Sequence, residues 1–429
     1  MSVLDLITLL IFLAAIFTLI NISVLKMPTT IGLMTIALIM SCLILVSGLF
    51  FPTFYEAAEH IVEEFDFEKV LMGVMLNFLL FAGALSTDLN KMFEEKWPII
   101  ILAVIGTAIS TFAVGYIMYW VFPYLGFEIE LIYCLLFGAL ISPTDPIAVL
   151  ALVKKVGLAK KLEIKIAGES LFNDGVGVVF FLTILQIVMA KNGIHSGGHG
   201  SGEVNAASVS FLFAKEVFGG LLLGGLFGYL GFKLLNFIDN DHVELEVLVT
   251  ITLVMVCGRI AEMTGVSGPI SMVILGLSVG NQGRDETLAN ATGAYVYKFW
   301  HLVDEALNAI LFILVGLEIL VIVEKFTFDS LKLGLASIVI VLFSRWLGVF
   351  FPIKAMAPWR TFEPRTIAIL TWGGLRGGLS VAMALSLQNY EWLDEALRQN
   401  ILFCTYCIVV FSILVQGLTI GKLLKKEGA

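Results

Sequence analysis

The stretch GESLFNDGVG, from Gly168 to Gly177, places Glu169, Asn173 and Asp174 inside a long apolar run. A charged residue at the centre of a bilayer costs at least ~2.5–3.5 kcal/mol, so carboxylates at this depth indicate a function. On a helix, Ser170 and Asp174 lie on one face, and Glu169 and Asn173 lie on the adjacent face. The two carboxylates therefore need not share one ligand.

A second apolar run, VLFSRWLGVF, contains Arg345, a cation that needs an anionic partner at this depth. Pairing Arg345 with Glu169 would satisfy both charges and leave Asp174 without a positive partner. A buried carboxylate of this kind takes up a proton more readily than one in water, or it binds a small cation. One acid that binds either H⁺ or a cation predicts an exchanger. The alternative, an ion-pair network that only fixes helix packing, leaves Asp174 unexplained.

Two apolar runs are interrupted at corresponding places. In SPTDP, Pro143 and Pro146 bracket Thr144 and Asp145, and each proline removes a backbone donor and unwinds a helix. In TWGGLRGG, pairs of glycines flank Arg376 and allow the same unwinding. Unwound backbone at membrane depth must be buried in protein or line a wet cavity. Paired interruptions in the two halves of a chain predict the substrate site of a transporter.

Oxygen atoms surround the uncompensated acid in this arrangement. Hard cations prefer oxygen ligands, and Thr144, Ser170 and Asp174 all supply them. These three are the predicted ligands of a monovalent cation. Asp145 could help directly or through water.

The composition predicts an all-α polytopic membrane protein. The 429 residues are 59% hydrophobic and only 14% charged, whereas soluble domains are roughly a quarter charged. The apolar runs repeatedly exceed the ~18 residues that indicate a membrane helix. We expect about thirteen spans, near 4–25, 30–50, 68–86, 97–122, 130–153, 164–190, 211–236, 244–263, 267–281, 300–322, 330–356, 363–387 and 399–422.

These spans predict one membrane domain over residues 1–429. Its first six-span repeat covers about 4–190, a linking helix covers about 211–236, and a second repeat covers about 244–422. Because no basic segment precedes the first span, we expect it to be retained and not cleaved. Of the 26 Lys and Arg residues, 17 fall in one set of alternating loops and 6 in the other. This bias places the N-terminus outside and the C-terminus in the cytoplasm. No nucleic-acid-binding surface is indicated.

Three segments, SPTDPIAVLALVKK, GESLFNDGVGVV and TWGGLRGGLSVAMALSL, resemble signature segments of the monovalent cation/proton antiporter superfamily. They are most similar to its NhaP-like bacterial branch, which is related to the animal sodium/hydrogen exchangers, and the resemblance covers essentially the whole chain. It implies a plasma (inner) membrane protein with thirteen helices in two inverted six-helix repeats. It also implies broken fifth and twelfth helices that cross near the midplane, and a homodimer that works by an elevator-like alternating access.

The resemblance also implies roles for individual residues. Asp174 resembles the aspartate that binds the cation and the proton, and Asn173 completes the Asn-Asp pair of the electroneutral branch. Ser170, the Thr144 backbone and the neighbouring Asp145 resemble the rest of the binding set. Glu169 with Arg345 resembles the family's ion pair, and Arg376 the arginine of the broken twelfth helix. At Ala82, some relatives carry a glutamate.

The expected function is exchange of Na⁺, or of Li⁺ or K⁺, for H⁺, with one cation per proton and no net charge moved. No cofactor and no enzymatic activity are expected, since the chain contains neither an HExxH nor a GxSxG motif. An ion-coupled solute symporter with a similar inverted-repeat fold is the alternative, and it would require a larger cavity. Among weaker positions, Arg259 could pair with Glu262, while Asp304 and Glu305 could line the inner funnel or cap a helix.

Overall fold

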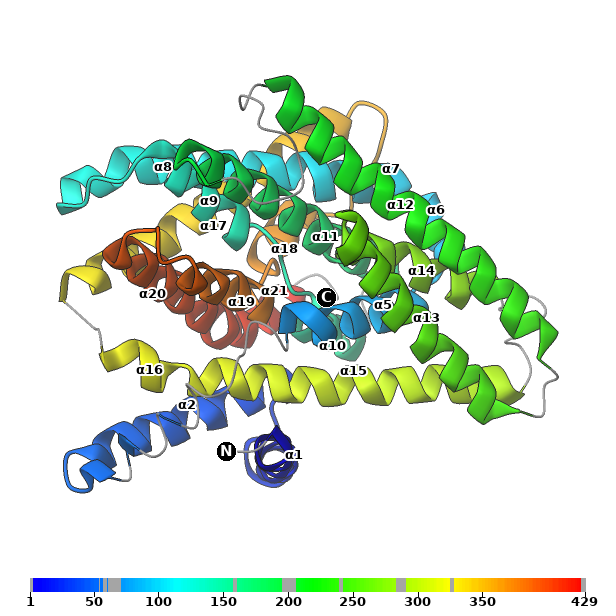
Figure 1. Cartoon of the computed structure of the whole chain (residues 1–429), viewed down its shortest axis with the longest axis horizontal. Coiled ribbons are helices and arrows are strands. Elements are labelled where there is room, and N and C mark those ends of the chain that lie inside the picture. The colour runs from blue at the N-terminus through cyan, green and yellow to red at the C-terminus, as the bar shows by residue number, and fades with distance from the viewer. Residues whose placement is uncertain are drawn as a thin grey trace.

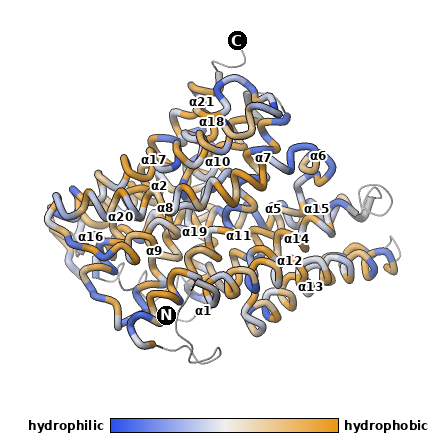
Figure 2. Tube along the Cα trace, turned by 90° about the horizontal axis from the view of Figure 1, so that it is seen from above, coloured by the Kyte–Doolittle hydropathy of each residue, from blue (hydrophilic) through white to orange (hydrophobic). Residues whose placement is uncertain are grey.

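The computed structural model describes residues 3–53, 55–56, 60, 71–156, 160–194, 206–238, 242–282, 291–324 and 328–425. These residues fold almost entirely into helices, and a single isolated β-bridge, between Asp145 and Leu375, is formed among them. Along most helices the side chains are apolar, while hydrophilic residues gather at helix ends and in loops (Figure 2). This all-helical, apolar architecture confirms the prediction of a polytopic α-helical membrane protein.

One group of helices lies at the edge that contains the N-terminus (Figure 1). It comprises α1 (Val3–Ile20, continued by a π-helical turn over Asn21–Leu25), α2 (Thr29–Gly48), α15 (Ala291–Leu317) and α16 (Ile319–Glu324). The long helix α15 crosses α2 closely, because a Cβ atom on Gly316 would lie only 2.4 Å from Cβ of Ala37. The hydroxyl of Ser41 donates to the carbonyl of Gly316 at 3.0 Å at the same crossing.

A second group is formed by α5 (Leu76–Ser86, preceded by a π-helical turn over Leu71–Met75), α12 (Ala206–Phe237), α13 (Val243–Thr264) and α14 (Gly268–Gln282). Gly220, Gly224 and Gly228 form one face of α12. They press against α14 of the same chain, where a Cβ on Gly224 would lie 2.5 Å from the carbonyl oxygen of Ser271. The spacing of small residues therefore serves close packing within the chain.

The remaining helices enclose the two interrupted segments. They are α6 (Leu89–Glu94), α7 (Lys96–Ile100, continued by a π-helical turn over Ile101–Gly106), α8 (Thr107–Val121), α9 (Leu131–Ile141), α10 (Ile147–Val156), α11 (Lys160–Lys191), α17 (Phe328–Met356), α18 (Thr366–Trp372), α19 (Gly378–Ser386), α20 (Glu395–Phe411, continued by a π-helical turn over Ser412–Gln416) and α21 (Gly417–Lys425). The largest hydrophobic core is built mainly from these helices and extends to α2 and α15.

Eight helices of the described chain are long and apolar enough to cross a membrane, and shorter apolar helices occur at 72–86, 131–141 and 268–281. Helix α13 matches the expected span 244–263 but is less apolar, because Glu244, Glu246, Arg259 and Glu262 lie on it. The helix ends agree with the expected spans to within a few residues in most places. The count of about thirteen, the inverted repeats and the division of the domain stay predictions.

Candidate functional site

The two interrupted segments meet each other inside the protein. Helix α9 ends at Ile141 and α10 begins at Ile147, while α18 ends at Trp372 and α19 begins at Gly378. Between them, the backbone N–H of Asp145 donates to the carbonyl of Leu375 at 2.8 Å. Both prolines and both glycine pairs therefore lie where the helical hydrogen bonding stops. We call this place the crossing, formed by residues 142–146 and 373–377.

Asp145 is held at the crossing by local geometry. Its Oδ1 accepts a hydrogen bond from the backbone N–H of Ile147 at 2.9 Å, so its negative charge lies at the positive end of α10. A Cβ on Gly377 would lie 2.5 Å from Oδ2 of Asp145. Only glycine therefore allows the two broken segments to approach this closely.

Asn173 joins α11 to the crossing. Its Oδ1 accepts from the backbone N–H of Thr144 at 3.2 Å, and its Nδ2 donates to Oγ1 of Thr144 at 2.7 Å and to Oε1 of Glu169 at 2.8 Å. The hydroxyl oxygens of Thr144 and Ser170 lie 3.2 Å apart. All four side chains are buried. Both amide hydrogens of Asn173 are therefore donated to protein oxygens. Asn173 positions Thr144, and it also directly precedes Asp174 in the sequence.

Glu169 and Arg345 form a buried, two-pronged ion pair. Nη1 and Nη2 of Arg345 donate to Oε1 and Oε2 of Glu169 at 2.8 and 2.9 Å, and Nε donates to the carbonyl of Leu370 at 3.3 Å. A Cβ on Gly374 would lie 2.6 Å from Nε of Arg345. The pair thus ties α11 to α17 and α18, and it uses up both oxygens of Glu169.

Asp174 differs from these neighbours. Its side chain is partly buried, and no hydrogen bond or ion pair joins its carboxylate to another residue that the structure describes. The charges that act on it are those of Asp145, Glu169 and Arg376. Glu169 is already paired with Arg345, and the remaining charges of Asp145 and Arg376 have opposite signs. Asp174 therefore presents its own negative charge and free acceptor oxygens to a proton or a cation.

Arg376 supplies the positive charge on the other side of the crossing. Its backbone N–H donates to Oγ of Ser412 at 2.9 Å, and Nη1 donates to the carbonyl of Gly374 at 3.3 Å. Its Nε is buried without a partner among the described residues. A pocket lined in part by Arg345, Gly374, Arg376 and Gln416 has a volume of about 10 Å³, close to the space needed by one water molecule.

Sequence reasoning missed several residues of this environment. The hydroxyl of Ser412 donates to Oε1 of Gln416 at 2.7 Å, and Nε2 of Gln416 donates to the carbonyl of Trp372 at 3.0 Å. Together they hold the end of α18 beside Arg376. The only sequence feature that could have identified Ser412 and Gln416 is that they are polar residues within the apolar run of the last expected span.

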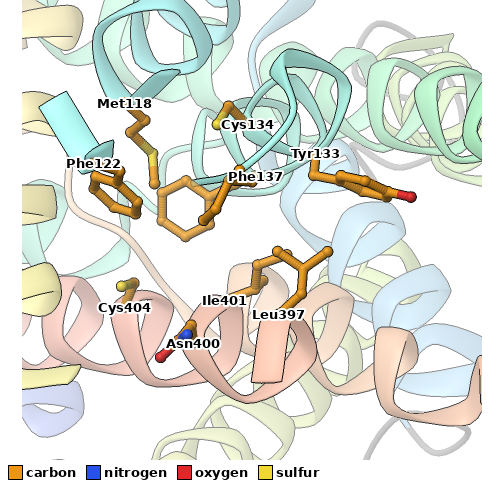
Figure 3. Close-up of a pocket in the computed structure, with 10 residues that line it drawn as sticks. Met118, Phe122, Tyr133, Cys134, Phe137, Leu397, Asn400, Ile401 and Cys404 are labelled. Carbon is orange, nitrogen blue, oxygen red and sulfur yellow. The ribbon is translucent and has the colours of Figure 1, made fainter. Parts of the chain in front are cut away.

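Other predicted positions lie away from the crossing. Arg259 and Glu262 pair with each other at 2.6 Å on the exposed face of α13. Ala82 is buried in α5. A second pocket, lined by Met118, Phe137, Cys404 and other mainly apolar residues of α8, α9 and α20, has a volume of about 10 Å³ (Figure 3). It lacks the charged groups found at the crossing.

Comparison with known proteins agrees with this geometry. Residues 9–426 match the family described as sodium/hydrogen exchanger, transmembrane. The chain is 42% identical to the Na⁺/H⁺ antiporter NhaP of Pseudomonas aeruginosa, over 99% of this chain and 96% of that protein. It is 35% identical to the Na⁺/H⁺ antiporter NhaG of Bacillus atrophaeus, over 88% of this chain and 67% of that protein.

The fold is similar to that of the sodium proton antiporter MjNhaP1 from Methanocaldococcus jannaschii. The TM-score is 0.77 at 20% identity, and the match covers 100% of both chains. The predicted resemblance is thereby confirmed. This chain belongs to the sodium/hydrogen exchanger family.

Proposed function

We propose that this protein is a secondary active transporter that exchanges Na⁺ for H⁺ across a membrane by alternating access. The observation that carries the proposal is Asp174, a carboxylate at the crossing without a hydrogen-bond or ion-pair partner in the described chain. Relatives that match most of this chain are named Na⁺/H⁺ antiporters, which supports the same function. These relatives are transporters, and we expect no enzymatic activity.

In the proposed mechanism, Asp174 binds a proton or a cation, but not both. Ser170 and Thr144 supply further oxygen atoms close to α11, and Asp145 contributes its charge directly or through water. Oxygen donors of this kind suit a small hard cation. Na⁺ is the expected substrate, and Li⁺ and K⁺ have the same ligand chemistry. If Glu169 stays ionised against Arg345, one cation is exchanged for one proton and no net charge moves.

A solute symporter is not supported. None of the relatives reported above is named as one. A channel would require multi-site binding along a continuous pore, whereas Asp174 and Asp145 at the crossing suit one alternately exposed site.

The protein is a multi-pass membrane protein, and we propose that it lies in the plasma (inner) membrane with the N-terminus outside and the C-terminus in the cytoplasm. The distribution of Lys and Arg among the loops supports this orientation. Exposed apolar side chains, such as Leu222 and Phe237 on α12 and Phe12 on α1, would contact lipid or a second copy. We further propose a homodimer, as the family resemblance implies.

The test uses purified protein in liposomes with an acidic interior and a pH-sensitive fluorescent probe. Addition of Na⁺ outside should release protons and restore the fluorescence, and Li⁺ and K⁺ added in turn rank the cations. Liposomes containing Asp174→Asn serve as the control. No response to any of the three cations, or an equal response from the control, would reject the proposal.

A further inference from the structure

Helix α15 contains a polar stripe in an otherwise apolar membrane span. His301, Asp304, Glu305 and Asn308 follow one another at the spacing of a single helix face. The side chains of His301 and Glu305 are 68% and 69% exposed, Asp304 is partly buried and Asn308 is only 4% exposed. The stripe therefore runs from an exposed end into the interior.

The buried end of the stripe points toward the crossing. Leu311 follows Asn308 by one turn on α15, and a Cβ on Gly378 would lie 2.3 Å from Cδ1 of Leu311. Gly378 is the first residue of α19, directly after the unwound segment. At 1.5 Å per residue, Asp304 lies roughly 10 Å along the helix from this contact.

Asp304 and Asn308 are hydrogen-bonded to each other, and this leaves a buried oxygen atom of the pair without a donor among the described residues. Nδ2 of Asn308 donates to Oδ1 of Asp304 at 3.0 Å. This bond holds the carboxylate in place. The other atom of the amide, Oδ1, is buried without a partner among the described residues. A buried acceptor left unpaired is unfavourable, and a bound cation with its water would satisfy it.

The surrounding charges favour a cation at this position. The negative charges of Asp145 and Glu305 favour a cation beside Asp304, whereas a protonated His301 opposes it. Asp304 lies well inside α15, which begins at Ala291. It therefore does not cap the helix. His301 and Glu305 lie in the first two turns of the expected span 300–322, and their exposed side chains approach each other at 3.9 Å. Polar groups avoid lipid, so this end of the stripe is expected to face water at the membrane surface.

We propose that Asp304, positioned by Asn308, is a transient binding site for a hydrated monovalent cation on the path between the aqueous face and Asp174. The inference rests on the proposed exchange function and adds a residue that sets how effectively the cation reaches the crossing. Fixed negative charge in a low-dielectric cleft raises the local cation concentration about 10-fold or more, and added salt weakens the effect.

The test compares Asp304→Asn with wild-type protein in the liposome assay. The amide oxygen of the variant can still accept the bond from Asn308, so we expect normal folding. The half-saturation concentration for Na⁺ should rise about 5- to 10-fold at low ionic strength, and the maximal rate should change less than about twofold. An impermeant salt should shrink the difference between the two proteins.

Two further variants separate this role from a structural one. Asp304→Glu, which keeps the charge, should restore the wild-type half-saturation concentration. Asp329→Asn, which removes an exposed acid paired with Lys332 on α17, should leave it unchanged. If the wild-type protein exchanges ions but Asp304→Asn retains the wild-type half-saturation concentration, this inference fails and the proposed function stands. A loss of maximal rate that Asp304→Glu does not restore would also overturn it. Absence of exchange by the wild-type protein would instead reject the proposed function.

Discussion

The backbone N–H of Asp145 donates to the carbonyl oxygen of Leu375, 2.8 Å away, and joins two broken helices that are far apart in the chain. This single bond holds Asp145 beside the segment that also contains Arg376. The ends of four half-helices meet there as well, so their dipoles act on whatever occupies the crossing. The position of Asp145 therefore depends on how closely the unwound segment 373–377 can approach the segment 142–146.

The variant Gly377→Ala tests whether exchange requires the close approach of Gly377 to Asp145. The new Cβ would lie 2.5 Å from Oδ2 and 2.8 Å from Cβ of Asp145, so the side chain cannot avoid it by rotation alone. We expect a loss of about 1–3 kcal/mol in stability and about a tenfold or greater drop in exchange rate. Gly421→Ala in α21, where nothing lies within 4 Å, is the matched control. Equal rates in the two variants would show that the spacing does not matter.

Asp174→Asn should insert and fold but lose exchange. The amide keeps the shape of the carboxylate while removing the charge that binds the cation and the site that binds the proton. Since the carboxylate of Asp174 makes no hydrogen bond or ion pair with the rest of the described chain, its replacement should leave thermal stability close to that of the wild type. Transport in liposomes and thermal unfolding are measured on the same preparation. If Asp174→Asn exchanges ions at more than a small fraction of the wild-type rate, Asp174 is not the residue that binds the cation and the proton.

The sequence predicted those features of this region that depend on local chemistry. A proline unwinds a helix wherever it lies, so the interruption at Thr144 and Asp145 could be read directly. A buried Arg345 needs an anion, which singled out Glu169. Contacts set by tertiary packing could not be read in this way. The bond between Asp145 and Leu375 and the burial of Asn308 both depend on how helices distant in the sequence pack against each other. The sequence alone therefore could not decide whether Asp304 lines the inner funnel or caps a helix.

Glu169→Ala and Arg345→Ala should each destabilise the protein. Removing one partner of a buried ion pair leaves the other charge unpaired, at a cost of about 3–5 kcal/mol. The loss of Glu169 also removes an acceptor for Asn173. We expect the double variant to recover part of the loss in thermal stability, because no lone charge remains. If the two single losses simply add, the residues do not act as partners.

The stability of the protein in acid should depend on Glu363, in the loop between α17 and α18. Burial opposes its ionisation, but a 2.8 Å hydrogen bond from Lys165 and the charges of Lys165 and Lys161 outweigh this effect, and the pKa of Glu363 lies below its ordinary value. A carboxyl whose pKa is lowered by folding stabilises the protein above its ordinary pKa. This contribution is lost as the pH falls through the lowered value.

Glu363→Gln should therefore lower the unfolding temperature at pH 7 by more than it does in strong acid. Thermal unfolding at a series of pH values measures this difference. Glu391→Gln, at an exposed position before α20, is the control and should have little effect at any pH. A deficit in Glu363→Gln that is constant with pH would show that its charge does not contribute.

The charge balance of Asp174 makes a last prediction about transport itself. With Glu169 ionised against Arg345, the empty site carries one negative charge and is neutral when it holds either a proton or a monovalent cation. Either loaded form can cross, while the bare charge is held back by the cost of moving it through hydrocarbon. One cation then exchanges for one proton.

Because protons and cations compete for Asp174, the half-saturation concentration for Na⁺ should rise as the pH falls through the range in which this acid takes up a proton. Measurement in liposomes at several pH values tests the competition, and an imposed membrane potential tests the charge balance. Exchange driven by potential alone at zero ion gradients, or a half-saturation concentration that does not vary with pH, would contradict the scheme. A second acid would then have to share the proton, and Asp145, whose charge already acts on Asp174 across the crossing, is the residue placed to do so.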